Sequence, residues 1–290
     1  MFHTIKNSTL TVTVSEMGAE LQSIVGADGT EYLWQGDPAY WSKRSPNLFP
    51  YIGRMPDKTY CLDGQKYQMP IHGFAPTSLF SLVDKSDTHL LFELTDNEET
   101  YGYYPRHFSF RVFYRLNGNR IDVTFCAENR DEKTMYFSMG GHPGFRLPLV
   151  DGLAFEDYRL RFAEKCLPTR VTFCKDYLVA GRAPYPLRDD CIISLRHDLF
   201  DDDAVVLEGS GTSVTLETDK DSHSIMVDYP QMKYVGFWHT TKSDAPFVCI
   251  EPWSALPSRS GVTESLETQP DLTALEPGCQ HANAWSITIK

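Results

Sequence analysis

Short segments in which polar and apolar residues alternate recur along most of the chain, and they limit the possible folds more than any other feature. The segments cover residues 9–14, 90–94, 108–114, 120–128, 158–162, 204–207, 213–216, 224–228, 234–238, 247–250 and 284–289. A period of two is typical of strands that turn one face toward a core. Gly, Asn and Asp separate several of these segments and supply the backbone conformations that hairpins need. The pattern predicts an all-β fold with antiparallel connections.

Helical periodicity is weak throughout, and its best case is a turn or two within residues 256–266. The chain lacks both GxGxxG and GxxxxGK[ST], the glycine-rich patterns that cradle phosphates, so we expect no nucleotide cofactor. No internal repeat and no Pro/Gly/Ser-rich linker divides the sequence. Its 290 residues fit one large β-sandwich or barrel, and we expect a single domain over residues 1–290.

The charge balance and the cysteines indicate which kinds of partner and which cellular compartment to expect. With 27 Lys and Arg against 39 Asp and Glu, the net charge is −12, and no basic stripe offers a surface for nucleic acid. The seven cysteines are odd in number, widely spread and without a CxxC pair, which indicates reduced thiols. No long apolar run or leader-like segment is present, so we expect a cytoplasmic protein that does not bind membranes.

Three segments place a titratable residue among Gly, Pro and aromatic residues. His72 precedes Gly73, His142 follows two glycines and precedes Pro143, and Glu251 ends the apolar run 247–250. A histidine beside glycine or proline sits where the backbone bends and can approach a ligand, although a hydrogen-bonded structural histidine fits the same pattern. A carboxylate in an apolar run costs free energy to desolvate unless a ligand uses it, which favours a functional Glu251.

Taken in chain order, these residues resemble a known signature. Arg54, His72 in His-Gly-Phe, His142 in Gly-His-Pro and Glu251 in Ile-Glu-Pro are similar in order to the motifs of the aldose 1-epimerase (galactose mutarotase) family. The likeness spans essentially the whole chain, and residues 48–54 and 236–239 resemble the LacX-like bacterial branch. The resemblance implies a large antiparallel β-sandwich and a cofactor-free reaction that interconverts the α and β anomers of an aldose.

The resemblance also implies a role for each of these four residues. Glu251 matches the general base that removes the proton of the anomeric hydroxyl, and His142 matches the general acid that protonates the ring oxygen. His72 and Arg54 match residues that hold the sugar in register. A carboxylate and an imidazole poised on opposite sides of a hemiacetal can each contribute roughly 10² to 10⁴ in rate.

Two further charged residues are candidates for binding the substrate. The family carries an aspartate that binds sugar hydroxyls, and Asp203 resembles it, although its neighbours Asp201 and Asp202 leave the register open. Arg44 stands where related sugar-phosphate epimerases carry a phosphate-binding arginine, so it predicts a contact to a phosphorylated hexose. A surface charge is the alternative for Arg44.

Aromatic residues near these motifs offer flat surfaces on which a pyranose could stack. Phe74 and Trp238 are candidate platforms, and Trp253 is a weaker one. Burial within a sheet is the alternative for each of these three rings.

The sequence predicts no metal site. The histidines at positions 72, 142, 197, 223 and 239 show none of the HxH, HxxxH or HExxH spacings, so only the fold could assemble a ligand set. Cys249 lies two residues before Glu251, which places both on one face of a strand. A small buried thiol is the expected role of Cys249 rather than that of a nucleophile.

Several functions remain open at this stage. The first is a mutarotase of a free hexose, and the second is a hexose-6-phosphate mutarotase; either would act as a monomer or a homodimer on a small-molecule sugar. The third is a non-catalytic carbohydrate-binding protein, which would not need an acid and a base. A glycosidase relative would need two carboxylates, and only Glu251 stands out.

Overall fold

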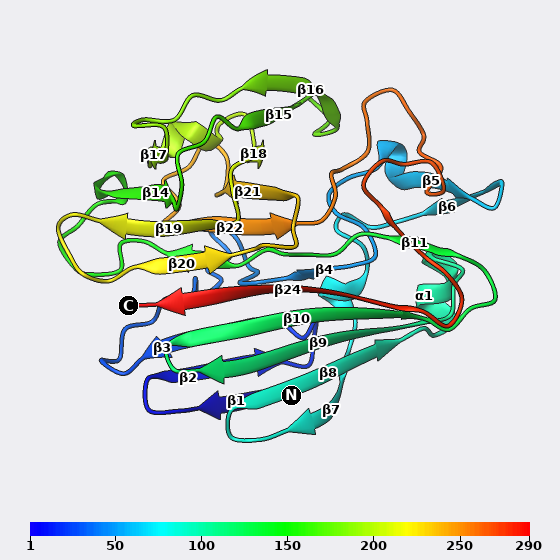
Figure 1. Ribbon diagram of the computed structural model, residues 1–290, viewed down its shortest axis with the longest axis horizontal. Helices are drawn as coiled ribbons and strands as arrows, with labels where there is room; N and C mark the ends of the chain where they lie inside the picture. Colours follow the sequence, from blue (N-terminus) through cyan, green and yellow to red (C-terminus); the bar gives the residue numbers. More distant parts are fainter.

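The computed structural model describes residues 1–290 and consists mainly of antiparallel strands in two large and three small sheets (Figure 1). The nine-stranded sheet has the order β17 (Ile192–Ser194), β14 (Tyr158–Phe162), β19 (Ser213–Thr218), β20 (Ile225–Asp228), β24 (Gln280–Ile289), β10 (Arg120–Asn129), β9 (Phe108–Asn117), β8 (His89–Thr95) and β7 (Ser81–Lys85). The eight-stranded sheet has the order β16 (Val179–Pro184), β15 (Thr169–Phe173), β18 (Val205–Glu208), β21 (Tyr234–Trp238), β22 (Phe247–Trp253), β12 (Gly140–Gly141) and β4 (Asn47–Leu48), and β13 (Gly144–Arg146) also pairs with β22.

The remaining elements are small. One sheet contains β1 (Phe2–Lys6), β2 (Leu10–Ser15) and β3 (Leu21–Gly26), and two pairs are β5 (Thr59–Leu62) with β6 (Gln65–Gln68) and β11 (Met135–Phe137) with β23 (Thr273–Leu275). The one α-helix is α1 (Glu98–Tyr103), and the 3-10 helices are η1 (Pro56–Lys58), η2 (Ala75–Thr77), η3 (Phe155–Asp157) and η4 (His197–Phe200). None of these helices is both long enough and apolar enough to span a membrane.

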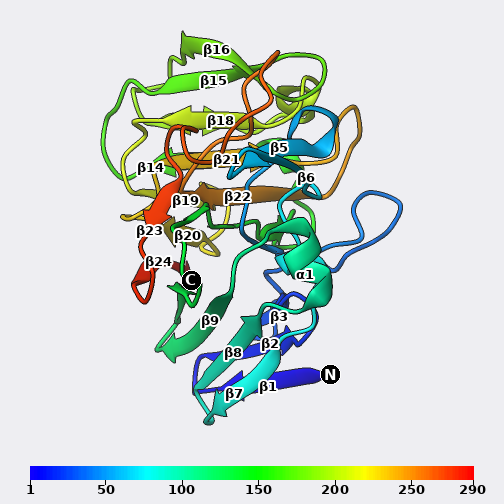
Figure 2. The ribbon, with the colours of Figure 1, turned by 90° about the vertical axis from the view of Figure 1, so that its right-hand side faces the viewer.

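The two large sheets pack face to face as a sandwich. A single core of 61 buried residues draws side chains from both. Phe162 of β14 and Phe237 of β21 meet with ring centroids 6.0 Å apart, so the two sheets are in direct contact. In Figure 2, β16, β15, β18, β21 and β22 follow one another downward in their order within the eight-stranded sheet. The predicted all-β sandwich is confirmed.

Each of the eleven segments predicted as strands overlaps a strand, and residues 158–162 and 234–238 coincide with β14 and β21. The predicted helical turn within residues 256–266 is wrong. Its backbone groups bond to other segments: the amide of Ser258 donates to the carbonyl of Arg54, and the carbonyl of Glu264 accepts from the amide of Cys61. Helix α1, which the periodicity did not indicate, is capped by Asn97, whose side chain accepts from the amide of Thr100.

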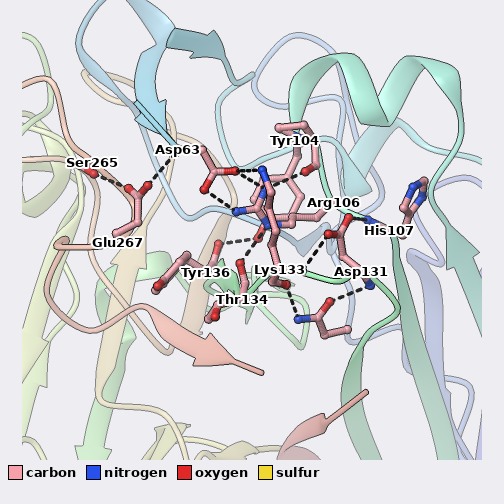
Figure 3. A network of polar contacts seen from close by, with 12 residues as sticks. Asp63, Tyr104, Arg106, His107, Asp131, Lys133, Thr134, Tyr136, Ser265 and Glu267 are labelled. Carbon is pink, nitrogen blue, oxygen red and sulfur yellow. Dashed lines mark hydrogen bonds and ion pairs between the residues drawn. The ribbon is translucent and has the colours of Figure 1, made fainter. Parts of the chain in front are cut away.

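A buried arginine anchors the β5–β6 hairpin to the rest of the fold (Figure 3). Arg106 is 1% exposed and donates to the backbone carbonyl of Thr134 and to both carboxylate oxygens of Asp63 in the hairpin turn. Lys133 also donates to Asp63, at 2.9 Å. Bidentate pairs of this kind fix geometry as well as adding stability. The network therefore anchors the turn of the hairpin that connects the segments carrying Arg54 and His72.

Candidate active site

Strand β22 presents Glu251 on the face of the eight-stranded sheet that points away from the main core. Val248 and Ile250 belong to the core between the sheets, whereas Cys249 and Glu251 alternate with them and point the other way. Gly236 of β21 lies opposite Glu251 in the register and leaves room beside the carboxyl group. The predicted placement of Cys249 and Glu251 on one face is therefore confirmed.

His142 lies between two short strands, β12 before it in the chain and β13 after it, and both strands pair with β22. Gly140 of β12 is opposite Trp253, and Gly144 of β13 is opposite Cys249. A Cβ atom on Gly141 would lie 2.6 Å from the indole ring of Trp285 in the facing sheet, so only glycine fits before His142. The Gly-Gly-His-Pro sequence thus brings the backbone close to the second sheet and directs the imidazole to the opposite face.

Arg54 and His72 come from two segments that are bonded to each other. The amide of His72 donates to the carbonyl of Gly53 at 2.9 Å, and the amide of Gly53 donates to Nδ1 of His72 at 3.2 Å. The backbone of His72 has φ +63°, and Gly73 has φ +75° with its Cα so close to the Phe49 carbonyl oxygen that a Cβ would lie 2.1 Å from it. Glycine is therefore required at position 73, and His72 is held in a left-handed backbone conformation beside it.

These segments enclose one cavity of about 360 Å³, which lies within the range of small-molecule sites. Among its 19 lining residues are seven that the sequence analysis singled out as site residues: Arg54, His72, His142, Asp203, Trp238, Glu251 and Trp253. Residues more than a hundred positions apart in the chain thus converge on one pocket.

At the base of the cavity an imidazole and a carboxyl group are in contact. Nε2 of His142 lies 3.2 Å from Oε2 of Glu251, and the two residues are 8% and 1% exposed. Burial raises the pKa of Glu251 well above its usual range, and the nearby Asp203 carboxylate raises it further. Burial lowers the pKa of His142 well below its usual range, and His72 adds to this shift. The lowered pKa leaves the His142 imidazole neutral at pH 7, and the raised pKa of Glu251 favours its protonated, neutral form.

The pair also has unused hydrogen-bonding capacity. The approach of His142 Nε2 to Oε2 of Glu251 lacks the geometry of a hydrogen bond, so Oε2 of Glu251 is buried without a hydrogen-bond partner, as is Nδ1 of His142. Such atoms are rare in folded proteins because each costs roughly 1–3 kcal/mol, and they concentrate at sites where a ligand supplies the partner. The indole of Trp41 stacks on the His142 ring with centroids 4.9 Å apart and fixes the ring plane.

His72 stands beside His142 as a neutral hydrogen-bond donor. Their ring centroids are 5.5 Å apart in an edge-on arrangement. Burial, together with the positive charge of Arg54, lowers the pKa of His72 to about 4. Because Nδ1 of His72 accepts from the amide of Gly53, its proton resides on Nε2 at neutral pH.

The acidic run contributes one residue to the cavity. Asp203 lines it with φ +83°, whereas Asp201 and Asp202 are exposed and do not line it. Burial raises the pKa of Asp203, and the guanidinium of Arg54 partly opposes this shift. The guanidinium of Arg54 in turn lies over the ring of Tyr177, 5.0 Å from its centroid.

Two predicted site residues lie outside the cavity. Arg44 does not line it, because its guanidinium donates to the Gln22 carbonyl and to the Gln35 side chain. Phe74 is 3% exposed and packs against Phe49 and Phe108 in the core, so the prediction of a stacking platform is wrong for Phe74.

Trp238 and Trp253 both line the cavity, so two of the three candidate platforms are available to a ligand. The lining residues that the sequence analysis missed include Trp41, Lys43 and Tyr177. Lys43 directly precedes Arg44, the residue that the sequence analysis selected, but only Lys43 lines the cavity. Tyr177 lies between two strands, and nothing in its local sequence indicates a site.

Comparisons with known proteins agree over the length of the chain. A model of the family described as aldose 1-epimerase matches residues 1–269. The plasmid-encoded protein LacX of Lactococcus lactis subsp. lactis is 34% identical over 295 residues, with 98% of each chain covered. A galactose mutarotase related enzyme from Lactobacillus acidophilus has 35% identity and a TM-score of 0.94, with coverage of 100% of this chain and 97% of that one. A galactose mutarotase-like protein from Lactobacillus casei has 31% identity and a TM-score of 0.95, with both chains fully covered.

Proposed function

Because the chain belongs to the aldose 1-epimerase family, we propose that it is a mutarotase that interconverts the α and β anomers of a free hexose. Family membership indicates a carbohydrate epimerase, and the matches to LacX confirm the predicted branch. The observation that carries the finer proposal is the contact of 3.2 Å between Nε2 of His142 and Oε2 of Glu251 at the base of the cavity.

In the proposed reaction the pair moves one proton between two oxygen atoms of the sugar. Glu251 takes the proton of the anomeric hydroxyl while His142 delivers a proton to the ring oxygen, and the bond from C1 to that oxygen breaks. The open-chain aldehyde rotates about C1–C2, and the ring closes with both transfers reversed. Because the two oxygens are bonded to the same carbon, a base and an acid that lie side by side suit the reaction better than the opposed arrangement expected from the sequence.

The pKa shifts of the two residues fit this cycle. Neutral Glu251 and neutral His142 correspond to the state that the pair reaches after ring opening, and transfer of the shared proton to His142 gives the state that attacks the ring form. Arg54, Asp203 and His72 line the same cavity, and we expect them to bind hydroxyl groups of the sugar, His72 through its Nε2 proton. None of these steps needs an external proton donor during turnover.

Polarimetry tests the proposal directly. Freshly dissolved α-glucose or α-galactose should lose its initial optical rotation faster in the presence of the protein than in buffer alone. If neither these sugars nor the corresponding 6-phosphates mutarotate faster, the proposal fails.

A second candidate, a hexose-6-phosphate mutarotase, is favoured by two cations at the cavity. Lys43 and Arg54 both line it, and a phosphate group pairs readily with such side chains. Under this alternative, Lys43→Ala would lower activity on the 6-phosphate alone. Arg44→Ala is the matched control because Arg44 carries the same charge next in sequence but does not line the cavity.

We expect the pH profile of kcat/KM to be flat across neutral pH. At pH values between the lowered pKa of His142 and the raised pKa of Glu251, the pair holds one proton. It holds two protons below this pH range and none above it. Activity should therefore fall on the acid side near the pKa of His72, about 4, or where His142 gains its proton, and on the alkaline side as Glu251 ionises. Polarimetric rates corrected for the buffer reaction measure this profile. A rise in activity centred near pH 6.5, as for an ordinary histidine, would contradict it.

A further inference from the structure

Three different ligand atoms meet beneath the cavity, and one of them has no role in the proposed reaction. A nitrogen of His142, the sulfur of Cys249 and an oxygen of Glu251 all lie within 4.8 Å of one another. All three residues are buried, with exposures of 8%, 0% and 1%. Cys249 and Glu251 project from one face of β22, and His142 is held opposite them by the pairing of β12 and β13 with that strand.

The donor set is the one that zinc and similar cations select. Thiolate, imidazole and carboxylate are the three side-chain ligands of zinc, and tetrahedral sites with three protein ligands leave a fourth position open. With metal–ligand distances of roughly 2.0–2.2 Å, two N or O ligands of a tetrahedral ion lie about 3.3 Å apart. The observed separation of 3.2 Å between Nε2 of His142 and Oε2 of Glu251 is close to this value. The unpartnered Oε2 of Glu251 also has a lone pair free for a cation.

We propose that His142, Cys249 and Glu251 form a binding site for a thiophilic divalent cation such as Zn²⁺, and that its occupancy inhibits the enzyme. A thiolate and a carboxylate together carry two negative charges, which a divalent cation neutralises without leaving a net buried charge. His142 and Glu251 both line the cavity, so a cation held by them would compete with a sugar for the same side chains. The inhibition rests on the proposed function, whereas the cation site does not.

The site can be tested without any assay of activity. Metal-free protein, prepared with a chelator, is titrated with Co²⁺, whose thiolate complexes show a ligand-to-metal charge-transfer absorption. We expect this absorption in the parent protein and its loss in Cys249→Ser, which conserves the volume of the side chain. Cys279→Ser, which removes an exposed thiol, is the matched control and should keep the absorption. Thermal unfolding of the metal-free variants shows whether each is folded.

The inhibition is measured by polarimetry with Zn²⁺, relative to the metal-free rate of each variant. Loss of a direct ligand should raise the inhibition constant of Cys249→Ser by more than the roughly 10–100-fold that follows loss of an outer-shell partner. More sugar should relieve the inhibition in the parent protein. The proposal is overturned if the parent shows no cobalt–thiolate absorption, or if folded Cys249→Ser retains it.

The two proposals can fail separately. If the cobalt absorption depends on Cys249 but no sugar mutarotates, the cation site stands and the proposed function falls. If sugars mutarotate and Zn²⁺ inhibits the parent and folded Cys249→Ser equally, the proposed function stands and the cation site falls.

Discussion

Glu251→Gln should lower kcat/KM for mutarotation by a factor on the order of 10² to 10⁴, because the amide keeps the shape of the side chain but cannot accept the anomeric proton. The fold should tolerate this change. Burial raises the pKa of Glu251 and so favours its neutral form, which a neutral amide replaces without adding a buried charge. Polarimetry and thermal unfolding of the same samples measure the two effects.

Another buried glutamate provides the matched control. Glu264 is 1% exposed, does not line the cavity and accepts hydrogen bonds from the amide and guanidinium of Arg259. Glu264→Gln should lower the free energy of unfolding while its kcat stays near that of the parent. If Glu251→Gln instead loses stability and keeps its rate, Glu251 is a structural residue and the proposed mechanism is wrong.

The alternation of side chains along β22 shows what local sequence can predict. The apolar run that ends at Glu251 predicted a strand, and the period of two placed Cys249 beside the carboxyl group. The same reasoning found the strands because each one buries one of its faces locally. It missed α1, whose six residues are too few to show a period of 3.6, although the cap at Asn97 was visible in the sequence.

The errors at the site arise where tertiary contacts decide the direction of a side chain. Phe74 follows the His-Gly motif, yet the turn after Gly73 sends its ring into the core. Arg44 is bonded to Gln22 and Gln35, which are distant enough in sequence to give no local signal. Lys43, one position earlier, points into the cavity instead.

The contact between acid and base is likewise a property of the fold. The sequence indicated that His142 and Glu251 serve one sugar, but it placed them on opposite sides of the hemiacetal. Their approach to 3.2 Å follows from the pairing of β12 and β13 with β22, which depends on the close packing of Gly141 against Trp285. A pattern within a short stretch of sequence does not predict which distant strands pair with each other.

His142→Gln should also lower kcat/KM by roughly 10² to 10⁴, and the double variant with Glu251→Gln should lose little more than either single variant. The reason is that both residues act on one shared proton, so removing either partner disables the same transfer. Glutamine is the closest substitute because its amide reaches toward the position of Nε2, which contacts Glu251. A double-mutant cycle by polarimetry measures the coupling. Losses that multiply, each variant adding its full factor, would show that the two residues act in independent steps and would contradict the shared-proton mechanism.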